Sequence, residues 1–261
     1  MRGVAQKECM SRRRFFVSPE LIRSNTAALT ADQIHYLRDV LRLKSGDVVE
    51  VFDGEGRNYS GTILLSGEEA IIHSLAAVQC PQEPSSELTL AQALIKVDRF
   101  ELVLQKATEL GVREVVPLGT RYCEVRIDPS KIEARRERWQ RIVRDASRQC
   151  GRALVPRVRR PLEFSEFLRA SDWEKCARLL FHGHSGHAWD PSRVPPGAAL
   201  VCIGPEGGWH PDEVTAASAA GFRILSLGPR ILRAETAAIV TLALMQFRIA
   251  DSRHASENTA G

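Results

Sequence analysis

The chain has 261 residues, of which 44% are hydrophobic and 26% are charged. This composition is that of an ordinary soluble globular protein and excludes a disordered, collagen-like or disulfide-stapled chain. The formal net charge of +4 is too small to identify a partner.

The two ends of the chain and the cysteines indicate the cellular compartment of the protein. Residues 1–11 and 251–261 lack periodicity and are predicted to be loose tails, so that either Met1 or Met10 can be the true start. The first residues contain no apolar core of a secretory signal, and the longest uncharged apolar stretch, 237–247, is too short to span a membrane. The six scattered cysteines form no C-x-x-C pair. We expect a cytoplasmic protein.

Short strands dominate the first part of the chain. Strands are predicted at residues 14–17, 48–52, 59–64 and 70–75, with turn signals such as the DGEG run at 53–56 between them. One amphipathic helix, opened by Thr30, interrupts them. This pattern predicts a small β-barrel or β-sandwich domain over residues 12–80.

Strands and helices alternate after a linker-like segment at residues 81–87. The expected strands are 88–95, 114–118, 154–158, 177–182, 199–203 and 223–227, and the expected helices are 99–110, 129–149, 162–170, 211–220 and 235–250. This order predicts an α/β domain over residues 88–250 with a mostly parallel sheet. Ligands bind such sheets beyond the carboxyl ends of the strands, which directs attention to the loops there.

The segment 131–160, which includes most of the helix predicted at 129–149, carries the whole positive excess of the chain. Residues 131–160 hold eleven basic and three acidic residues, a local charge of +8, and the remaining residues together carry −4. Charge runs are often only solvated helix faces, but this surplus of arginine favours phosphate, and hence nucleic acid, as a partner.

Two glycine-containing loops are predicted to open on the same edge of the sheet. The first is IGPEGGW at 203–209 and the second is LGPRILRAET at 227–236; each follows an apolar strand and precedes a helix. Neither has the spacing of a dinucleotide fingerprint or a phosphate-binding P-loop. The apolar Ile231 and Leu232 can form the floor of a pocket for a flat aromatic group. Tight turns and loop packing are the alternatives.

A third loop, FHGHSGH at 181–187, contains three histidines. The spacing is close to that of binuclear zinc hydrolases, but Gly186 stands where those enzymes have aspartate. A single loop histidine that touches a ligand is the alternative, and we expect no metal ligands.

At these motifs the sequence resembles the RsmE family of ribosomal RNA methyltransferases, members of the SPOUT (trefoil-knot) superfamily. Arg148 departs from the family pattern, which usually has glutamate there, and it adds to the local basic charge. The matching segments are 203–208, 227–233 with 235–236, QKATELGV at 105–112, RW at 138–139 with QCGR at 149–152, and His35 with 40–42 and 52–54.

The resemblance implies a fold and an activity. The fold would be an N-terminal PUA-like β-barrel that binds RNA, followed by a SPOUT methyltransferase domain with a trefoil-knotted parallel sheet. The chain would act as a homodimer that uses S-adenosylmethionine to methylate N3 of a decoding-region uridine in 16S rRNA of the small ribosomal subunit.

The resemblance also assigns residues to roles. The expected cofactor-binding residues are Leu180, His182, Gly183, Ile203, Gly204, Gly207, Gly208, Leu227, Gly228, Ile231 and Leu232. The expected RNA-binding residues are Arg14, His35, Arg38, Arg42, Arg141, Arg144, Arg148 and Arg152.

Uracil N3 carries a proton, so its methylation requires removal of the proton or stabilisation of the negative charge that develops on the flanking carbonyls. Arg233 can stabilise this charge, and Glu206 or Glu235 can accept the proton. Two other functions stay open at this point: a non-catalytic RNA-binding protein, and a zinc-dependent hydrolase that uses His184 and His187.

Overall fold

The computed structural model describes residues 13–79, 87–170, 173, 175–183, 189–190 and 197–257. The predicted N-terminal tail and nearly all of the predicted linker lie outside these residues. Within them, no helix combines the length and the apolar character needed to cross a bilayer.

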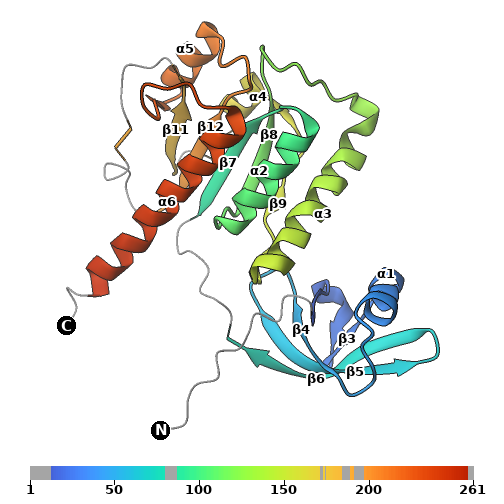
Figure 1. Ribbon diagram of the computed structural model, residues 1–261. Coiled ribbons are helices and arrows are strands. Elements are labelled where there is room, and N and C mark those ends of the chain that lie inside the picture. The colour runs from blue at the N-terminus through green and yellow to red at the C-terminus, as the bar shows by residue number, and fades with distance from the viewer. Residues whose placement is uncertain are drawn as a thin grey trace. The chain divides into compact units, whose positions relative to one another are not determined.

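The chain forms two compact units, and each unit combines segments that are distant in the sequence (Figure 1). The first unit comprises Met1–Glu83 together with Arg144–Val155, and the second comprises Pro84–Val143 together with Pro156–Gly261.

A six-stranded sheet in the order β1-β4-β5-β6-β3-β2 builds the first unit. Strand β1 pairs in parallel with β4, and the other neighbours are antiparallel. The short strands β2 and β3 were not predicted from the sequence. The strands are β1 Arg14–Phe16, β2 Ile22–Arg23, β3 Thr26–Ala28, β4 Val48–Phe52, β5 Asn58–Ser66 and β6 Glu69–Val78.

A helical segment covers the core of this sheet. Thr30 caps α1 (Ala31–His35) as predicted: its hydroxyl accepts from the Gln33 amide, and the Gln33 side chain accepts from the Thr30 amide. A π-helical turn, η3 (Tyr36–Val40), follows and buries Leu37 completely. Apolar side chains of the strands pack with Leu37, including Phe15, Ala27, Val49, Val51, Ile63 and Ile72.

Residues 144–155 complete the first unit through the buried Arg14. Only 2% of Arg14 is exposed. Its guanidinium donates to the Ser147 carbonyl at 3.0 Å and to Asn58 Oδ1 at 2.7 Å, and it lies 4.2 Å from the centre of the Phe52 ring. This cation therefore joins two strands of the sheet to the last turn of a helix that is more than a hundred residues away in sequence.

Two further arginines of the same helix lie over aromatic rings of the first unit. The guanidinium of Arg144 lies 4.6 Å from the Phe16 ring centre, and that of Arg148 lies 5.7 Å from the Tyr36 ring centre. Such contacts contribute about 0.5–2 kcal/mol each. The arginine that replaces the usual glutamate of the family thus has a structural contact.

A parallel sheet in the order β10-β8-β7-β12-β11-β13, with β9 also paired to β8, forms the centre of the second unit. Strands β7 and β12 are buried at every position, as expected for central strands covered on both faces. The strands are β7 Leu88–Ala93, β8 Glu114–Gly119, β9 Arg157–Val158, β10 Leu162–Glu163, β11 Ala177–Phe181, β12 Ala199–Ile203 and β13 Arg223–Leu225.

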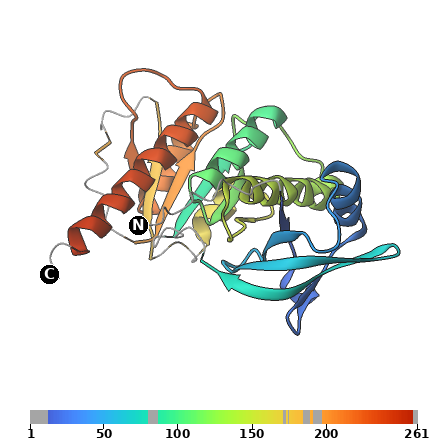
Figure 2. The same cartoon turned by 60° about the horizontal axis from the view of Figure 1, so that its bottom comes forward.

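Helices cover both faces of this sheet (Figures 1 and 2). Helices α2 (Val97–Glu109) and α6 (Ala234–Glu257) pack on each other on one face, while α4 (Phe164–Arg169) and α5 (Pro211–Ala219) pack together on the other. The long helix α3 (Ile132–Cys150) contacts α2 through Trp139, whose ring centre lies 4.6 Å from that of Phe100. Gly111, predicted to terminate α2, has the left-handed φ of +80° that this position requires.

The structure corrects the boundaries of three predicted elements. The first two residues of the helix expected at 162–170 instead form β10, because Leu162 pairs with Leu118 at the edge of the sheet. The helix α4 begins at Phe164. The strand expected at 154–158 shrinks to β9, since Leu154 instead forms a bridge with Gly54 in the first unit. The last helix continues to Glu257, so residues 251–257 are not the loose tail that was predicted.

The positive charge of the basic segment 131–160 is partly neutralised in the structure. Glu101 of α2 pairs with Arg138 at 2.7 Å, and Glu114 of β8 pairs with Arg159 at 3.0 Å. Glu133 pairs with both Arg136 and Arg160. Acids from elements outside the segment therefore neutralise part of the local +8. Arg141 is exposed and pairs with no acid among the described residues.

Arg14→Ala should destabilise the protein by about 2–4 kcal/mol, because it leaves the buried Asn58 amide and the Ser147 carbonyl without their charged donor. Denaturant unfolding measures this loss. The matched control is Arg141→Ala, which removes an exposed arginine and should cost no more than about 0.5 kcal/mol. Equal costs for the two variants would contradict the structural role of Arg14.

Candidate active site

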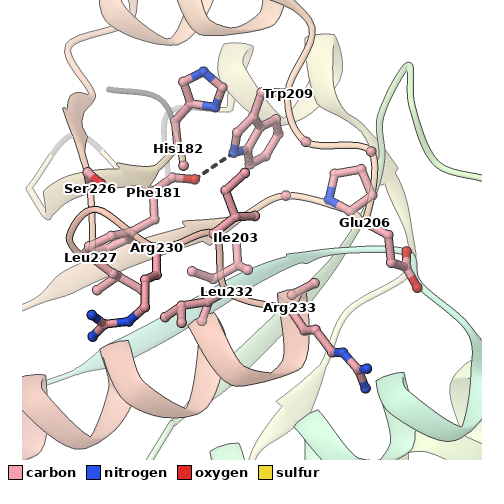
Figure 3. A pocket seen from close by; sticks show the side chains of 18 of the residues that line it. Phe181, His182, Ile203, Glu206, Trp209, Ser226, Leu227, Arg230, Leu232 and Arg233 are labelled. Carbon is pink, nitrogen blue, oxygen red and sulfur yellow. Dashed lines mark hydrogen bonds between the residues drawn. The ribbon is translucent and has the colours of Figure 1, made fainter. Parts of the chain in front are cut away.

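A cavity of about 510 Å³ lies at the carboxyl ends of β11, β12 and β13 (Figure 3). Three loops that are distant in the sequence meet there, as expected for the edge of a parallel sheet. The lining residues are Arg99, 181–183, 203–209, Ser226, Leu227, 230–234 and Ala237.

A buried tryptophan holds the loop that follows β12. The Trp209 indole N–H donates to the Phe181 carbonyl at 2.9 Å and so joins the ends of β12 and β11 (Figure 3). Its ring lies under Gly204, where an added Cβ would be 3.0 Å from the indole nitrogen. A side chain at position 204 would therefore displace either the loop or the tryptophan.

Two other glycines of this loop face different constraints. Gly208 has a φ of +74° with open space beside it, so a side chain there would strain the backbone. A Cβ at Gly207 would come within 3.0 Å of the Tyr122 Cβ. Glycine at 207 thus allows the loop that follows β8 to pack directly against the loop that follows β12.

The loop between β13 and α6 forms the opposite wall. Gly228 has a φ of +115°, and the Ser226 hydroxyl bonds its amide and carbonyl. Ile231 is 73% exposed, yet its Cγ1 lies 4.0 Å from the position of a Cβ at Gly183. This exposed apolar side chain and the loop after β11 are therefore neighbours at the cavity.

All but two of the expected cofactor residues line the cavity. Leu180 is fully buried in the core of the second unit, and Gly228 shapes the loop without lining the space. The residues at the cavity are His182, Gly183, Ile203, Gly204, Gly207, Gly208, Leu227, Ile231 and Leu232.

The charged residues include one that the sequence analysis missed. Arg99, at the start of α2, lines the cavity and lies between two carboxylates: its Nη1 is 3.7 Å from Glu206 Oε1, and its Nε is 3.8 Å from Glu235 Oε1. The Lys96 amide also donates to Glu206 at 3.4 Å. The position of Arg99 at the start of the predicted helix 99–110, just beyond the predicted strand 88–95, was a usable signal.

The two expected proton acceptors differ in access. Glu206 lines the cavity, whereas Glu235 is only 8% exposed and does not. Arg230 and Arg233 also line the cavity, are exposed, and form no ion pair with a described acid. In Figure 3, Arg233 and Glu206 lie at one end of the pocket and His182 lies at the other.

The cavity suits a ligand that has both a flat apolar part and polar ends. Ile203, Leu227 and Leu232 supply apolar surface, and the glycine backbones permit close approach. Glu206 and Arg233 supply charge at one end, and Arg230 supplies it on the other side of the pocket (Figure 3). This arrangement can hold a charged small molecule and present it to a second substrate.

Among the described residues, neither a metal site nor a reactive thiol at Cys176 or Cys202 has support. His184 and His187 lie outside the residues that the structure describes, and no group of three metal-binding side chains occurs within them. Burial raises the pKa of the Cys202 thiol and, with a further contribution from Glu87, that of Cys176. Both thiols therefore stay protonated at neutral pH and are poor nucleophiles.

The expected RNA-binding residues of the first unit are not equally accessible. Arg14 is buried, which corrects its assignment to the RNA-contacting surface. Arg38 donates to the Gly67 carbonyl, and the exposed His35 pairs with Asp39. Arg42 is exposed.

The expected RNA-binding residues of α3 and the following turn also differ in their exposure to solvent. Arg141 is exposed, while Arg144 and Arg148 are half-buried against the rings of the first unit. Arg152 is half-buried. His35, Arg42 and Arg141 are therefore the exposed members of the predicted set.

Comparison with known proteins gives two family matches. A family model described as an RNA methyltransferase domain matches residues 81–246, and one described as an RNA methyltransferase PUA domain matches residues 29–72. Ribosomal RNA small subunit methyltransferase E of Synechocystis sp. is 36% identical over 88% of this chain and 76% of its own length. The protein of the same name in Bacillus subtilis is 27% identical over 90% of this chain and 96% of its own length.

Solved structures confirm the predicted fold class, a PUA-like domain followed by an α/β domain of the SPOUT trefoil-knot type. Ribosomal RNA small subunit methyltransferase E of Neisseria gonorrhoeae, crystallised with S-adenosylmethionine, has a TM-score of 0.81 at 31% identity and covers 90% of this chain and 97% of its own. A Legionella pneumophila protein solved with the same cofactor has a TM-score of 0.80 at 32% identity, covering 90% and 96%.

Proposed function

Since the chain belongs to the RsmE family of ribosomal RNA methyltransferases, we propose that it binds S-adenosylmethionine and methylates 16S rRNA of the small subunit, at N3 of a decoding-region uridine. The observation that carries this proposal is the cavity formed by the three loops at 181–183, 203–209 and 226–234. Homodimerisation and a cytoplasmic location, which the sequence analysis expects, stay predictions.

The residues of the cavity fit this cofactor. Its volume of about 510 Å³ is that of a site for a drug-sized ligand. The apolar Ile203, Leu227 and Leu232 can contact the adenine, and the glycines at 204, 207 and 208 let the backbone approach a ligand closely. The neighbours from Neisseria gonorrhoeae and Legionella pneumophila, both solved with this cofactor, support the assignment.

The chain's own residues then have to align and activate the uracil. Bound S-adenosylmethionine supplies a sulfonium methyl group that leaves a neutral thioether, so alignment of the acceptor is the main requirement. Arg233, which lines the cavity and is exposed, would stabilise negative charge on the uracil carbonyls. Glu206 is a better proton acceptor than Glu235, because it lines the cavity and Glu235 does not. Arg99, between the two carboxylates, holds Glu206 in position.

The experiment that tests the function is methyl transfer from S-adenosylmethionine to small subunits and to naked 16S rRNA, with mapping of the modified base. We expect one methyl group on a uridine N3. Cofactor binding without transfer to either RNA, or transfer to another base, would contradict the proposal. RNA binding without cofactor binding would indicate a non-catalytic RNA-binding protein, and bound stoichiometric zinc would indicate a hydrolase.

Gly208→Val should abolish S-adenosylmethionine binding in a calorimetric titration, because valine tolerates the φ of +74° poorly and would distort the loop that contacts the cofactor. Gly46→Val is the matched control. Gly46 has a φ of +94° and open space beside it, but it lies in the first unit. The Gly46→Val variant should be less stable than the wild type but should bind S-adenosylmethionine with the same affinity. Equal cofactor affinity in the two variants would place the binding site elsewhere.

Arg233→Ala should reduce methyl transfer about 100-fold at saturating cofactor, the effect typical of removing a group that stabilises charge in a transition state. Single-turnover rates measure the change. Arg230→Ala removes a second exposed arginine of the same cavity and should have a smaller effect. A near wild-type rate in Arg233→Ala would rule out this role for Arg233.

A further inference from the structure

We propose that Tyr122 is the surface on which the target uracil stacks when it enters the active site. This inference rests on the proposed methyl transfer to RNA and adds the contact that positions the base. Tyr122 belongs to the loop that follows β8, which no motif of the sequence analysis included.

Tyr122 does not itself line the cavity, but it packs against a residue that does. Gly207 lines the cavity, and a Cβ there would meet the Tyr122 Cβ at 3.0 Å and the Tyr122 carbonyl oxygen at 3.3 Å. The residue before Gly207 is Glu206, the proposed proton acceptor. On this proposal, a base that lies on the tyrosine ring is beside the loop that carries the proposed proton acceptor.

The loop that carries Tyr122 is held firmly by α5. The Arg121 amide donates to Glu213 at 2.9 Å, and the Arg121 guanidinium donates to Asp212 at 3.0 Å and contacts the His210 ring. On the other side, Thr120 bonds the Cys123 sulfur at 3.1 Å. The backbone of residue 122 is thus fixed before any substrate arrives.

Despite this fixed backbone, 43% of Tyr122 is exposed. One part of its ring contacts His210, with ring centres 5.5 Å apart and planes at 57°. A tyrosine that served only to fill space between the two loops would be buried. A preorganised and exposed aromatic ring beside a cavity is what stacking of an unpaired base requires.

The charges around the cavity favour a nucleic acid as the occupant. Arg230 and Arg233 line it, are exposed and pair with no described acid. Arg230 can contact a phosphate of the RNA, while Arg233 is the group proposed above to stabilise the uracil carbonyls. An apolar peptide side chain would stack equally well on the ring but would leave these cations without partners.

The test compares Tyr122→Leu with Tyr122→Phe in methyl transfer to the small ribosomal subunit. Leucine removes the aromatic face, whereas phenylalanine keeps it. We expect kcat/KM for the RNA substrate to fall roughly 10-fold in Tyr122→Leu, in the range measured for loss of one base-stacking contact. Tyr122→Phe should stay within about twofold of the wild type, and both variants should bind S-adenosylmethionine normally in calorimetry.

A second substrate separates stacking from loss of folding. Dihydrouracil keeps the N3 proton but has a puckered ring that stacks poorly. The wild type should prefer a substrate with uracil at the target position, and Tyr122→Leu should lose this preference. Unchanged kcat/KM in Tyr122→Leu, equal damage in Tyr122→Phe, or a preserved preference for uracil in Tyr122→Leu would overturn the inference. Absence of transfer by the wild type would instead overturn the proposed function.

Discussion

The hydrogen bond between the Trp209 indole and the Phe181 carbonyl is the interaction on which the candidate site depends. Parallel strands bring their carboxyl ends to one edge, but this alone does not fix the shape of the loops beyond. Trp209 joins the ends of β11 and β12 and forms a support under Gly204. Since the bond is buried, its loss would leave an unsatisfied carbonyl at the wall of the cavity. The glycine loop is thus shaped by a bulky neighbour and not by flexibility.

Local patterns predicted most of the second unit. The buried strand β12 has a continuous apolar sequence and β7 a mostly apolar one. The apolar stripe and the terminal Gly111 define α2, and each glycine loop follows an apolar strand. These signals depend only on neighbours in the sequence. They were sufficient to identify the three loops of the cavity, and the resemblance of their motifs to a known family supplied the cofactor.

Contacts between distant residues were not predictable in the same way. The pairing of Arg99 with Glu206 and Glu235 joins α2 to two separate loops, and no spacing in the sequence encodes it. From the sequence alone, Arg14 is expected at the surface. It is instead buried, and it bonds to a helix that follows more than a hundred residues later. The partners of the basic segment, such as Glu101 and Glu114, also lie outside it. Charge counted along the chain therefore overestimates the charge available to RNA.

The first unit consists of two segments, Met1–Glu83 and Arg144–Val155, and this affects how the chain folds during its synthesis. Arg14 cannot donate to the Ser147 carbonyl until residue 147 has left the ribosome, which happens after α2, β8 and most of α3 have been translated. Domains generally fold as units from the N-terminus during synthesis. This chain instead completes its first unit only after it has begun the second, so the contact of Arg14 with Ser147 forms late although the sheet itself is built from residues 14–78.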